Sequence, residues 1–357
     1  MKNYIIFDLE WNQSPRGRED SVADFPFEII EIGAVKLDEN FQMVDEFHRL
    51  IRPQVYGQMH HMISEVTHMN MEELKARGMD FPEAARQFLC WCGEEPVYGT
   101  WGSMDLTELQ RNMAYYGMEA PFPFPLFYYD VQKLYGLFTA EGARLSLDAA
   151  VEQEGLLEKR PFHRALDDAY YTGRVLACLA EKTGAEALLP FQSVDYYRLP
   201  GNKKEEIQVT FPGYSKYVSR VFESREDAMK DRGVTSTKCY LCGKSLRKKI
   251  RWFTANQKMY FSLAVCPEHG YLKGKIRIKK ADGDRVFVVK TLKLTDEEGA
   301  AFVINKKEEL KKKRAERSRA KRQRQRQEEA ANKTRKKKGK KAKKERERGY
   351  REIDSSK

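Results

Sequence analysis

Short apolar runs alternate with helical repeats along the first half of the chain. Runs rich in β-branched and aromatic residues predict five strands, at 2–11, 27–37, 42–53, 95–102 and 125–131. Apolar residues at helical spacing predict four helices, at 81–93, 104–117, 146–155 and 163–184. This order predicts an α/β domain over residues 1–190, with a mixed β-sheet flanked by helices.

The pattern changes after Pro190. Residues 191–204 mix aromatic residues with Pro and Gly and are interpreted as a linker. Residues 205–294 alternate short apolar runs with turn signals, and the turns ANQK and ADGD predict two hairpins in a small, mainly β module. Residues 295–357 form a basic tail that lacks the apolar residues needed for a core, so we expect it to be disordered or a solvated helix.

Charge divides the chain in the same way. The 357 residues carry a net +12, but residues 1–202 hold 18 Lys/Arg against 32 Asp/Glu, a net of −14. Residues 203–357 hold 47 Lys/Arg against 21 Asp/Glu, a net of +26, which is typical of a polyanion-binding region. The stretch from Lys306 to Arg348 alone has 23 Lys/Arg and seven Glu. We expect an acidic domain joined to a nucleic-acid-binding region.

The N-terminus has too short an apolar run for a secretory signal, and no stretch of about 18 uncharged apolar residues occurs. We therefore expect a cytoplasmic protein that makes no membrane contact. Its six cysteines are expected to be reduced.

Acidic residues and one histidine occupy the ends of predicted elements in the first domain. Asp8 and Glu10 are two residues apart on a strand, so both carboxylates project from one sheet face, as a pair of metal ligands would. Asp105 lies where a strand gives way to a helix, where an acid can also serve simply to interact with the helix dipole. His163 precedes Asp168 by five residues at the start of another helix.

Together and in this order, these residues resemble the DEDDh exonucleases, which carry a D-x-E strand, a middle Asp and a final H-x4-D. The resemblance covers residues 3–183, and FPFEIIEIGAV, IRPQ and HHMISEVTHM look like the Eri-type subgroup. It implies a ribonuclease-H-like fold and 3′→5′ hydrolysis that releases 5′-mononucleotides. In the tyrosine subclass a Tyr stands where this chain has Arg164, so the histidine subclass fits.

The resemblance also implies residue roles. Asp8, Glu10, Asp105 and Asp168 would hold two Mg²⁺ or Mn²⁺ ions, and His163 would be the general base. Two acids remain as alternatives, with Asp130 competing with Asp105 and Asp167 standing beside Asp168. Substrate contacts are expected from a few residues that could equally belong to the core, namely Leu9, Trp11, Thr67 and Trp101.

Four residues of the second region have the spacing of a zinc site. Cys239 and Cys242 form a C-x2-C pair, and Cys266 and His269 form a C-x2-H pair after 23 intervening residues. Two such pairs predict one tetrahedral, structural Zn²⁺. Basic and aromatic residues surround these pairs and suggest contact with phosphates and bases: Lys244, Arg247, Lys248, Lys249, Arg251, Trp252, Phe253, Tyr260, Lys273, Lys275, Arg277, Lys279 and Lys280.

The sequence thus favours a metal-dependent 3′→5′ exonuclease acting on RNA, with the zinc module and the tail holding the substrate. A DNA exonuclease of the proofreading or repair type is one alternative. The other is a non-catalytic RNA- or ribosome-binding protein built on an exonuclease fold. Protein partners and the oligomeric state are not predicted.

Overall fold

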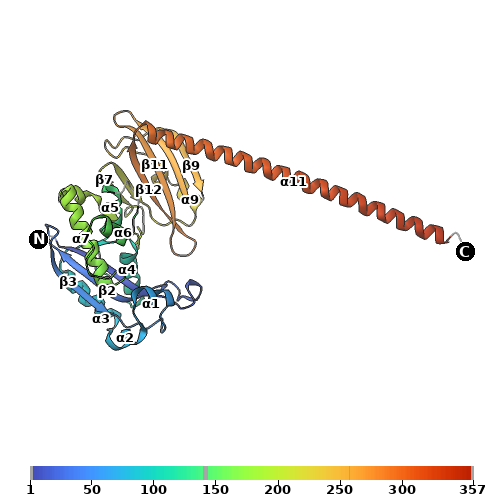
Figure 1. The fold of residues 1–357 in the computed structure, drawn as a ribbon. Helices are drawn as coiled ribbons and strands as arrows, with labels where there is room; N and C mark the ends of the chain where they lie inside the picture. Colours follow the sequence, from blue (N-terminus) through green and yellow to red (C-terminus); the bar gives the residue numbers. More distant parts are fainter. Residues whose placement is uncertain (1–2, 140–143, 257, 355–357) are drawn as a thin grey trace. The chain divides into compact units, whose positions relative to one another are not determined.

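The chain divides into two compact units, Met1–Gly201 and Asn202–Lys357. The computed structural model describes residues 3–139, 144–256 and 258–354, and it describes side chains within these ranges up to Glu328, except that of Arg18. Figure 1 traces both units as ribbons. No helix in the described ranges combines the length and the apolar character needed to cross a membrane.

The first unit is built on a six-stranded sheet in the order β3-β2-β1-β4-β5-β6. β1 is antiparallel to β2 and parallel to β4, and β4 is parallel to β5. The strands are β1 (Tyr4–Asn12), β2 (Glu28–Leu37), β3 (Met43–Leu50), β4 (Val97–Thr100), β5 (Phe127–Asp130) and β6 (Ser193–Val194). The predicted α/β fold with a mixed sheet is confirmed.

Helices cover both faces of this sheet (Figure 1). One core cluster joins the strands to α3 and α4, and another joins them to α5, α6 and α7. The helices are α1 (His61–Thr67), α2 (Met71–Arg77), α3 (Phe81–Cys92), α4 (Met104–Tyr115), α5 (Val131–Phe138), α6 (Leu147–Gln153), α7 (Ala165–Thr183) and α8 (Ala185–Leu188). Two 3-10 turns occupy Arg18–Asp20 and Leu189–Phe191.

Several elements differ from the sequence prediction. Helices α1, α2 and α5 were not predicted, and β6 lies within the stretch 191–204 that was interpreted as a linker. Because Ser193 and Val194 pair with β5, the first sheet continues past residue 190. These two residues therefore belong to the first unit.

The second unit holds an antiparallel six-stranded sheet in the order β7-β8-β12-β11-β10-β9. Its strands are β7 (Ile207–Phe211), β8 (Tyr214–Val218), β9 (Lys248–Asn256), β10 (Met259–Cys266), β11 (Gly270–Lys280) and β12 (Val286–Thr295). Both predicted hairpins are present, joining β9 to β10 and β11 to β12. The short helices α9 (Arg225–Lys230) and α10 (Arg232–Thr235) pack on one face of this sheet.

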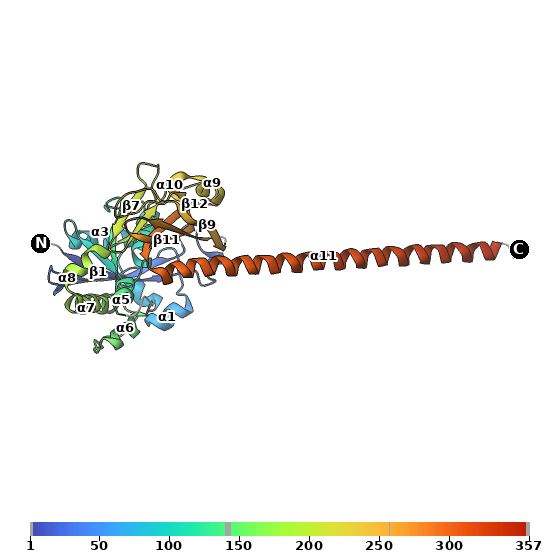
Figure 2. The same cartoon turned by 90° about the horizontal axis from the view of Figure 1, so that it is seen from above.

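The final helix, α11 (Glu297–Asp354), is continuous (Figure 2). Of the two expected states of the tail, the helical one is therefore observed. The expectation that the whole tail is solvated is wrong for its first turns, because Ala300 and Val303 are buried in a cluster with Ile250, Phe261 and Leu263. Arg314 also donates to the carbonyl of Thr254 on β9, at 2.7 Å.

Candidate active site and metal centre

Strand β1 presents two carboxylates to the face of the sheet that α7 covers. Tyr4 and Ile6 point to that face and are buried in the cluster that includes α7. Since successive strand residues alternate between faces, Asp8 and Glu10 project the same way. Leu9 projects to the other face, where it is part of the core against α3 and α4.

The first turn of α7 lies directly on β2. Gly33 pairs with Asp8 across the two strands, and a Cβ on Gly33 would lie 2.0 Å from Leu166 N and 2.1 Å from Ala165 C. No side chain can be accommodated at such distances, so glycine is required at this position. The close approach brings Asp168, in the same helical turn, to the carboxylates of β1.

Asp8, Glu10 and Asp168 form one group whose ligand atoms all lie within 4.8 Å of one another. Asp168 Oδ2 accepts a hydrogen bond of 3.1 Å from the backbone N–H of His163. Its Oδ1 is buried and has no hydrogen-bond partner among the described residues. Clustered carboxylate oxygens that lack donors are suited to a hard divalent cation such as Mg²⁺ or Mn²⁺.

The middle acid, Asp105, lies beside this group and not within it. It is the second residue of α4 and is buried, and the backbone N–H of Leu9 donates to its carboxylate. The competing Asp130 is engaged elsewhere, because it accepts from Lys133 N at the start of α5 and lies 3.6 Å from Arg144. The structure therefore brings Asp105 to the acids of β1.

The clustered acids raise one another's pKa. Burial is the largest cause, and the neighbouring carboxylates add to it, so the pKa of Glu10 rises to about 8 and that of Asp8 lies well above its usual value. Burial likewise raises the pKa of Asp105 and of Asp168 to about 7, although backbone N–H groups partly offset this rise. Full ionisation near neutral pH therefore requires a bound cation.

Glu31 is a fifth acid at the site and is fully buried, and sequence reasoning missed it. It pairs with Glu10 across β1 and β2, yet its carboxylate is saturated by Arg164 at 2.7 Å, His48 at 2.6 Å and the Ala165 N–H at 3.0 Å. Burial would raise the pKa of Glu31, but these hydrogen bonds lower it below its usual value. Glu31 thus anchors the start of α7 and is not available as a ligand. The available signal was an acid within an otherwise apolar strand run.

The predicted base, His163, is exposed and has a left-handed backbone with φ of 66°. Among the described residues its contact with the acids is made by the backbone N–H, and no hydrogen bond of its imidazole to them is present. Asp167, the alternative to Asp168, lies 3.1 Å from Arg160 and outside the acid group.

The predicted substrate contacts are distributed unevenly. The side chains of Leu9 and Thr67 are buried. Thr67 Oγ1 donates to Ile63 O inside α1. Trp11 packs partly against the core and Phe27, with ring centroids 5.5 Å apart. Trp101, four residues before Asp105, is half-buried, and its Nε1 is buried without a hydrogen-bond partner in the described part of the chain.

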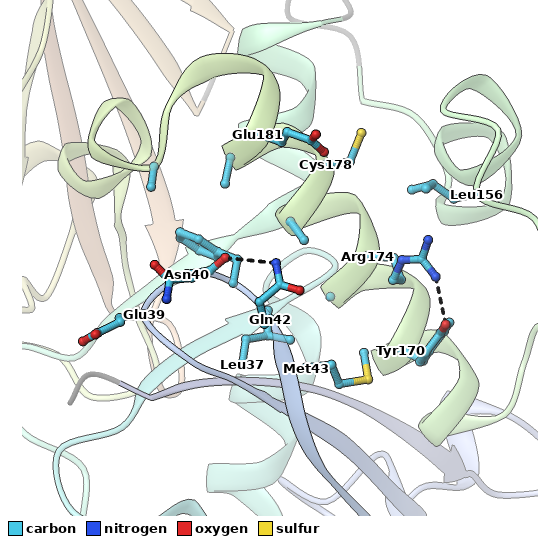
Figure 3. Close-up of a pocket in the computed structure, with 15 residues that line it drawn as sticks. Leu37, Glu39, Asn40, Gln42, Met43, Leu156, Tyr170, Arg174, Cys178 and Glu181 are labelled. Carbon is cyan, nitrogen blue, oxygen red and sulfur yellow. Dashed lines mark hydrogen bonds between the residues drawn. The ribbon is translucent and has the colours of Figure 1, made fainter.

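A separate pocket of about 840 Å³ lies between α7 and the β2–β3 turn (Figure 3). It is lined by apolar side chains such as Met43 and Leu156, together with Arg174, which donates to Tyr170 Oη at 2.9 Å. None of the clustered acids lines it. The chemistry of the first unit is therefore assigned to the acid group and not to this pocket.

The second unit brings the two predicted ligand pairs together. Cys239, Cys242, Cys266 and His269 offer ligand atoms within 4.8 Å of one another. Cys242 Sγ lies 3.7 Å from Cys266 Sγ, and His269 Nδ1 lies 3.6 Å from the sulfurs of Cys239 and Cys266. A tetrahedron with metal–sulfur distances of about 2.3 Å has edges of about 3.8 Å. The four groups therefore fit a tetrahedral metal ion.

The two pairs come from different parts of the chain. Cys239 and Cys242 lie in a tight turn in which Gly243 N–H donates to Cys239 O at 2.8 Å, with a φ of 70° at the glycine. Cys266 ends β10, and His269 lies in the turn to β11. Trp252, one of the expected stacking residues, donates to Thr235 O at 2.8 Å and packs against the cluster of buried residues that includes Cys239 and Cys266.

Known proteins resemble the first unit. Residues 5–176 match the family model described as Exonuclease. The first unit is thus similar to proteins of the exonuclease family. A curated relative from Bacillus subtilis (strain 168), named "Probable 3'-5' exonuclease KapD", is 28% identical over 166 residues, which are 46% of this chain and 78% of that protein. The resemblance to DEDDh-type 3′→5′ exonucleases is thereby confirmed, and nuclease activity at nucleic-acid 3′ ends is supported.

Two solved structures are also similar. The nuclease domain of 3'hExo, described as a DEDDh family member bound to rAMP, is 23% identical and covers 55% of this chain and 96% of its own, with a TM-score of 0.45. The zinc-bound E. coli ExoI–ssDNA complex is 12% identical and covers 74% of this chain and 54% of its own, with a TM-score of 0.46. The resemblance to the exonuclease family rests on the family model and the curated relative.

Proposed function

We propose that the protein is a two-metal 3′→5′ exoribonuclease that releases 5′-mononucleotides. The observation that carries this proposal is the group of Asp8, Glu10 and Asp168, whose oxygens converge from β1 and α7 within 4.8 Å. With Asp105 beside them, these acids would hold two Mg²⁺ or Mn²⁺ ions. Bound ions of this kind supply charge stabilisation for the attacking water and the leaving 3′-oxygen.

The chain's own groups have separate tasks in this scheme. Burial and mutual repulsion keep the acids short of full ionisation until cations arrive, so the site is set to bind positive charge. The backbone N–H of His163 orients Asp168. The exposed imidazole of His163 would accept the proton of the attacking water as a general base.

RNA is favoured over DNA by the resemblance to the Eri-type subgroup and by the basic second unit. That unit would hold the body of the substrate while the first unit acts on its 3′ end. The Cys/His group would bind one structural Zn²⁺, because four protein ligands leave no position open for catalysis. The enzyme is expected to work in the cytoplasm.

The deciding experiment compares 5′-labelled single-stranded RNA and DNA of one sequence, incubated with the full chain and Mg²⁺. We expect laddering from the 3′ end, faster on RNA, and none with Asp8→Asn/Glu10→Gln. Asp167→Asn is the matched control, since that acid pairs with Arg160 outside the acid group. Equal rates on RNA and DNA would support the DNA exonuclease instead, and no laddering of either would support a binding protein.

A further inference from the structure

One face of the second sheet concentrates positive charge. On β11, alternate residues point to the same side, so Lys273, Lys275 and Arg277 share a face, and Leu272, Ile276 and Ile278 are buried on the other. Lys293 on β12 is directly opposite Lys273 in the antiparallel register. The same face carries the docked first turns of α11.

Helix α11 adds both a cation and an aromatic ring to this face. Phe302 is 46% exposed although it is a large apolar side chain. Lys273 Nζ lies 4.3 Å from the centre of its ring, and Lys306 Nζ lies 5.0 Å from it. We call Lys273, Lys275, Arg277, Lys293, Lys306 and Phe302 the basic face.

The five cations of the basic face have no acidic partner within ion-pair distance among the residues the structure describes. Arg220 of the same unit, by contrast, is paired with Glu206 and Asp231. Like charges directly opposite on adjacent strands destabilise a sheet. Partial burial and the neighbouring cations accordingly lower the pKa of Lys273 and Lys275. An arrangement that is unfavourable in the free protein is favourable once a polyanion covers it.

We propose that the basic face binds the phosphate backbone of a single-stranded segment of the substrate, with an unpaired base stacked on Phe302. This proposal rests on the nuclease function proposed above and names the surface that holds the strand.

Geometry favours a single strand over a duplex. The cations of β11 form a straight row with a repeat of about 6.7 Å, twice the rise per strand residue. Phosphates of a duplex wind around its axis, so successive phosphates follow a straight row only in an extended single strand. Stacking on Phe302, which is partly exposed beside two ammonium groups, also requires an unpaired base.

The test measures RNA binding by the full chain in the inactive Asp8→Asn/Glu10→Gln background, so that the RNA stays intact. Lys273→Gln/Lys275→Gln/Lys293→Gln should weaken binding of single-stranded RNA roughly 10- to 100-fold at about 0.1 M salt. It should also reduce the slope of log K against log salt by about 2, since each lost contact contributes about 0.7 on a single strand. The control, Lys203→Gln/Lys204→Gln/Arg232→Gln, removes the same charge from outside the basic face.

Phe302→Ala separates stacking from charge. This variant should bind single-stranded RNA roughly 5- to 100-fold more weakly, and its affinity for duplex RNA should not change. The basic face would be ruled out as a binding site if the two triple variants lost the same amount of RNA affinity. An unchanged salt slope in the Lys273/Lys275/Lys293 variant would rule it out as well. Equal losses on single-stranded and duplex RNA with Phe302→Ala would overturn the single-strand assignment.

Two further measurements keep the outcomes distinct. The Lys273/Lys275/Lys293 variant should unfold at the same temperature as its parent or higher, because it loses repulsion, and this excludes misfolding as the cause of weak binding. With the active site restored, it should still hydrolyse a dinucleotide at the parental rate. Binding without hydrolysis in the unmodified chain would defeat the proposed function and leave the basic face intact.

Discussion

The acid group of the first unit and the basic face of the second are both built from like charges held side by side, but the acids converge on one point and the cations are spread along a strand. Glu10 and Asp168 lie in a low-dielectric setting that raises the pKa of Glu10 to about 8 and that of Asp168 to about 7. Lys273 and Lys275 are half-buried, and partial burial and the neighbouring cations lower their pKa. The convergence of carboxylate oxygens within 4.8 Å therefore suits the first site to small, strongly charged cations, and the row of cations along β11 suits the second to an extended, salt-sensitive ligand.

The largest effect is expected when negative charge is removed from the acid group. Asp8→Asn/Glu10→Gln should lower the hydrolysis rate by at least about 10³-fold, because the metal site supplies several kcal/mol of transition-state stabilisation. The same change should leave the magnesium-free protein as stable or more stable at pH 8, since it relieves repulsion among buried acids. Thermal unfolding with and without Mg²⁺ checks this. Strong destabilisation without Mg²⁺ would mean that the acids are structural.

We expect the sheet that carries the basic face to depend on the Zn²⁺ proposed for the Cys/His group. Cys242→Ser should abolish the one bound Zn²⁺ and destabilise the second unit by several kcal/mol, on the scale of structural zinc. Metal analysis and thermal unfolding measure the two effects. Cys90→Ser is the control, because Cys90 is exposed and lies outside the group. Full stability in metal-depleted Cys242→Ser would show that the sheet holds without the ion.

The pH dependence of stability should carry the signature of the buried acids. Because their folded pKa values are raised, the unfolded chain releases its protons first as pH rises, near pH 4. The magnesium-free protein should therefore lose stability as pH rises from about 4 to about 8 and level off above the folded pKa. Mg²⁺ should restore stability most at the high end. Scans in magnesium-free buffer, without chelator, spare the Cys/His group.

The pH trend should be nearly absent in Asp8→Asn/Glu10→Gln. A trend of the same size in that variant would assign the effect to other groups.

Glu31 differs from the acids of the acid group, because Arg164, His48 and the Ala165 N–H stabilise its negative charge. Glu31→Gln should destabilise the fold by about 2 kcal/mol by weakening the bonds to Arg164 and Ala165. It should also raise the Mg²⁺ concentration needed for half-maximal activity, since Asp168 depends on the placement of α7. Glu46→Gln, which breaks only an exposed pair with Arg160, should do neither.

A change in stability with no change in the Mg²⁺ requirement would make Glu31 structural alone.

The parts that the sequence could predict are those set by local pattern. Alternation along residues 2–11 placed Asp8 and Glu10 on one face, and the C-x2-C and C-x2-H spacings identified the metal group. Glu31 could not be assigned, because its partners Arg164 and Ala165 lie more than 130 residues away and become relevant only when Gly33 lets α7 approach β2. The docking of α11 was missed because it depends on a few apolar residues, such as Ala300 and Val303, at the start of a strongly basic segment.

The smallest effect on stability is expected when one charge is removed from the basic face. Lys293→Gln removes the charge opposite Lys273 and should stabilise the protein by about 0.2–0.5 kcal/mol at low salt. The gain should vanish at high salt, where exposed charges are screened. RNA affinity should fall severalfold in the same variant, so stability and binding move in opposite directions. Lys203→Gln should change neither, and a loss of stability in Lys293→Gln would show that the two lysines do not repel.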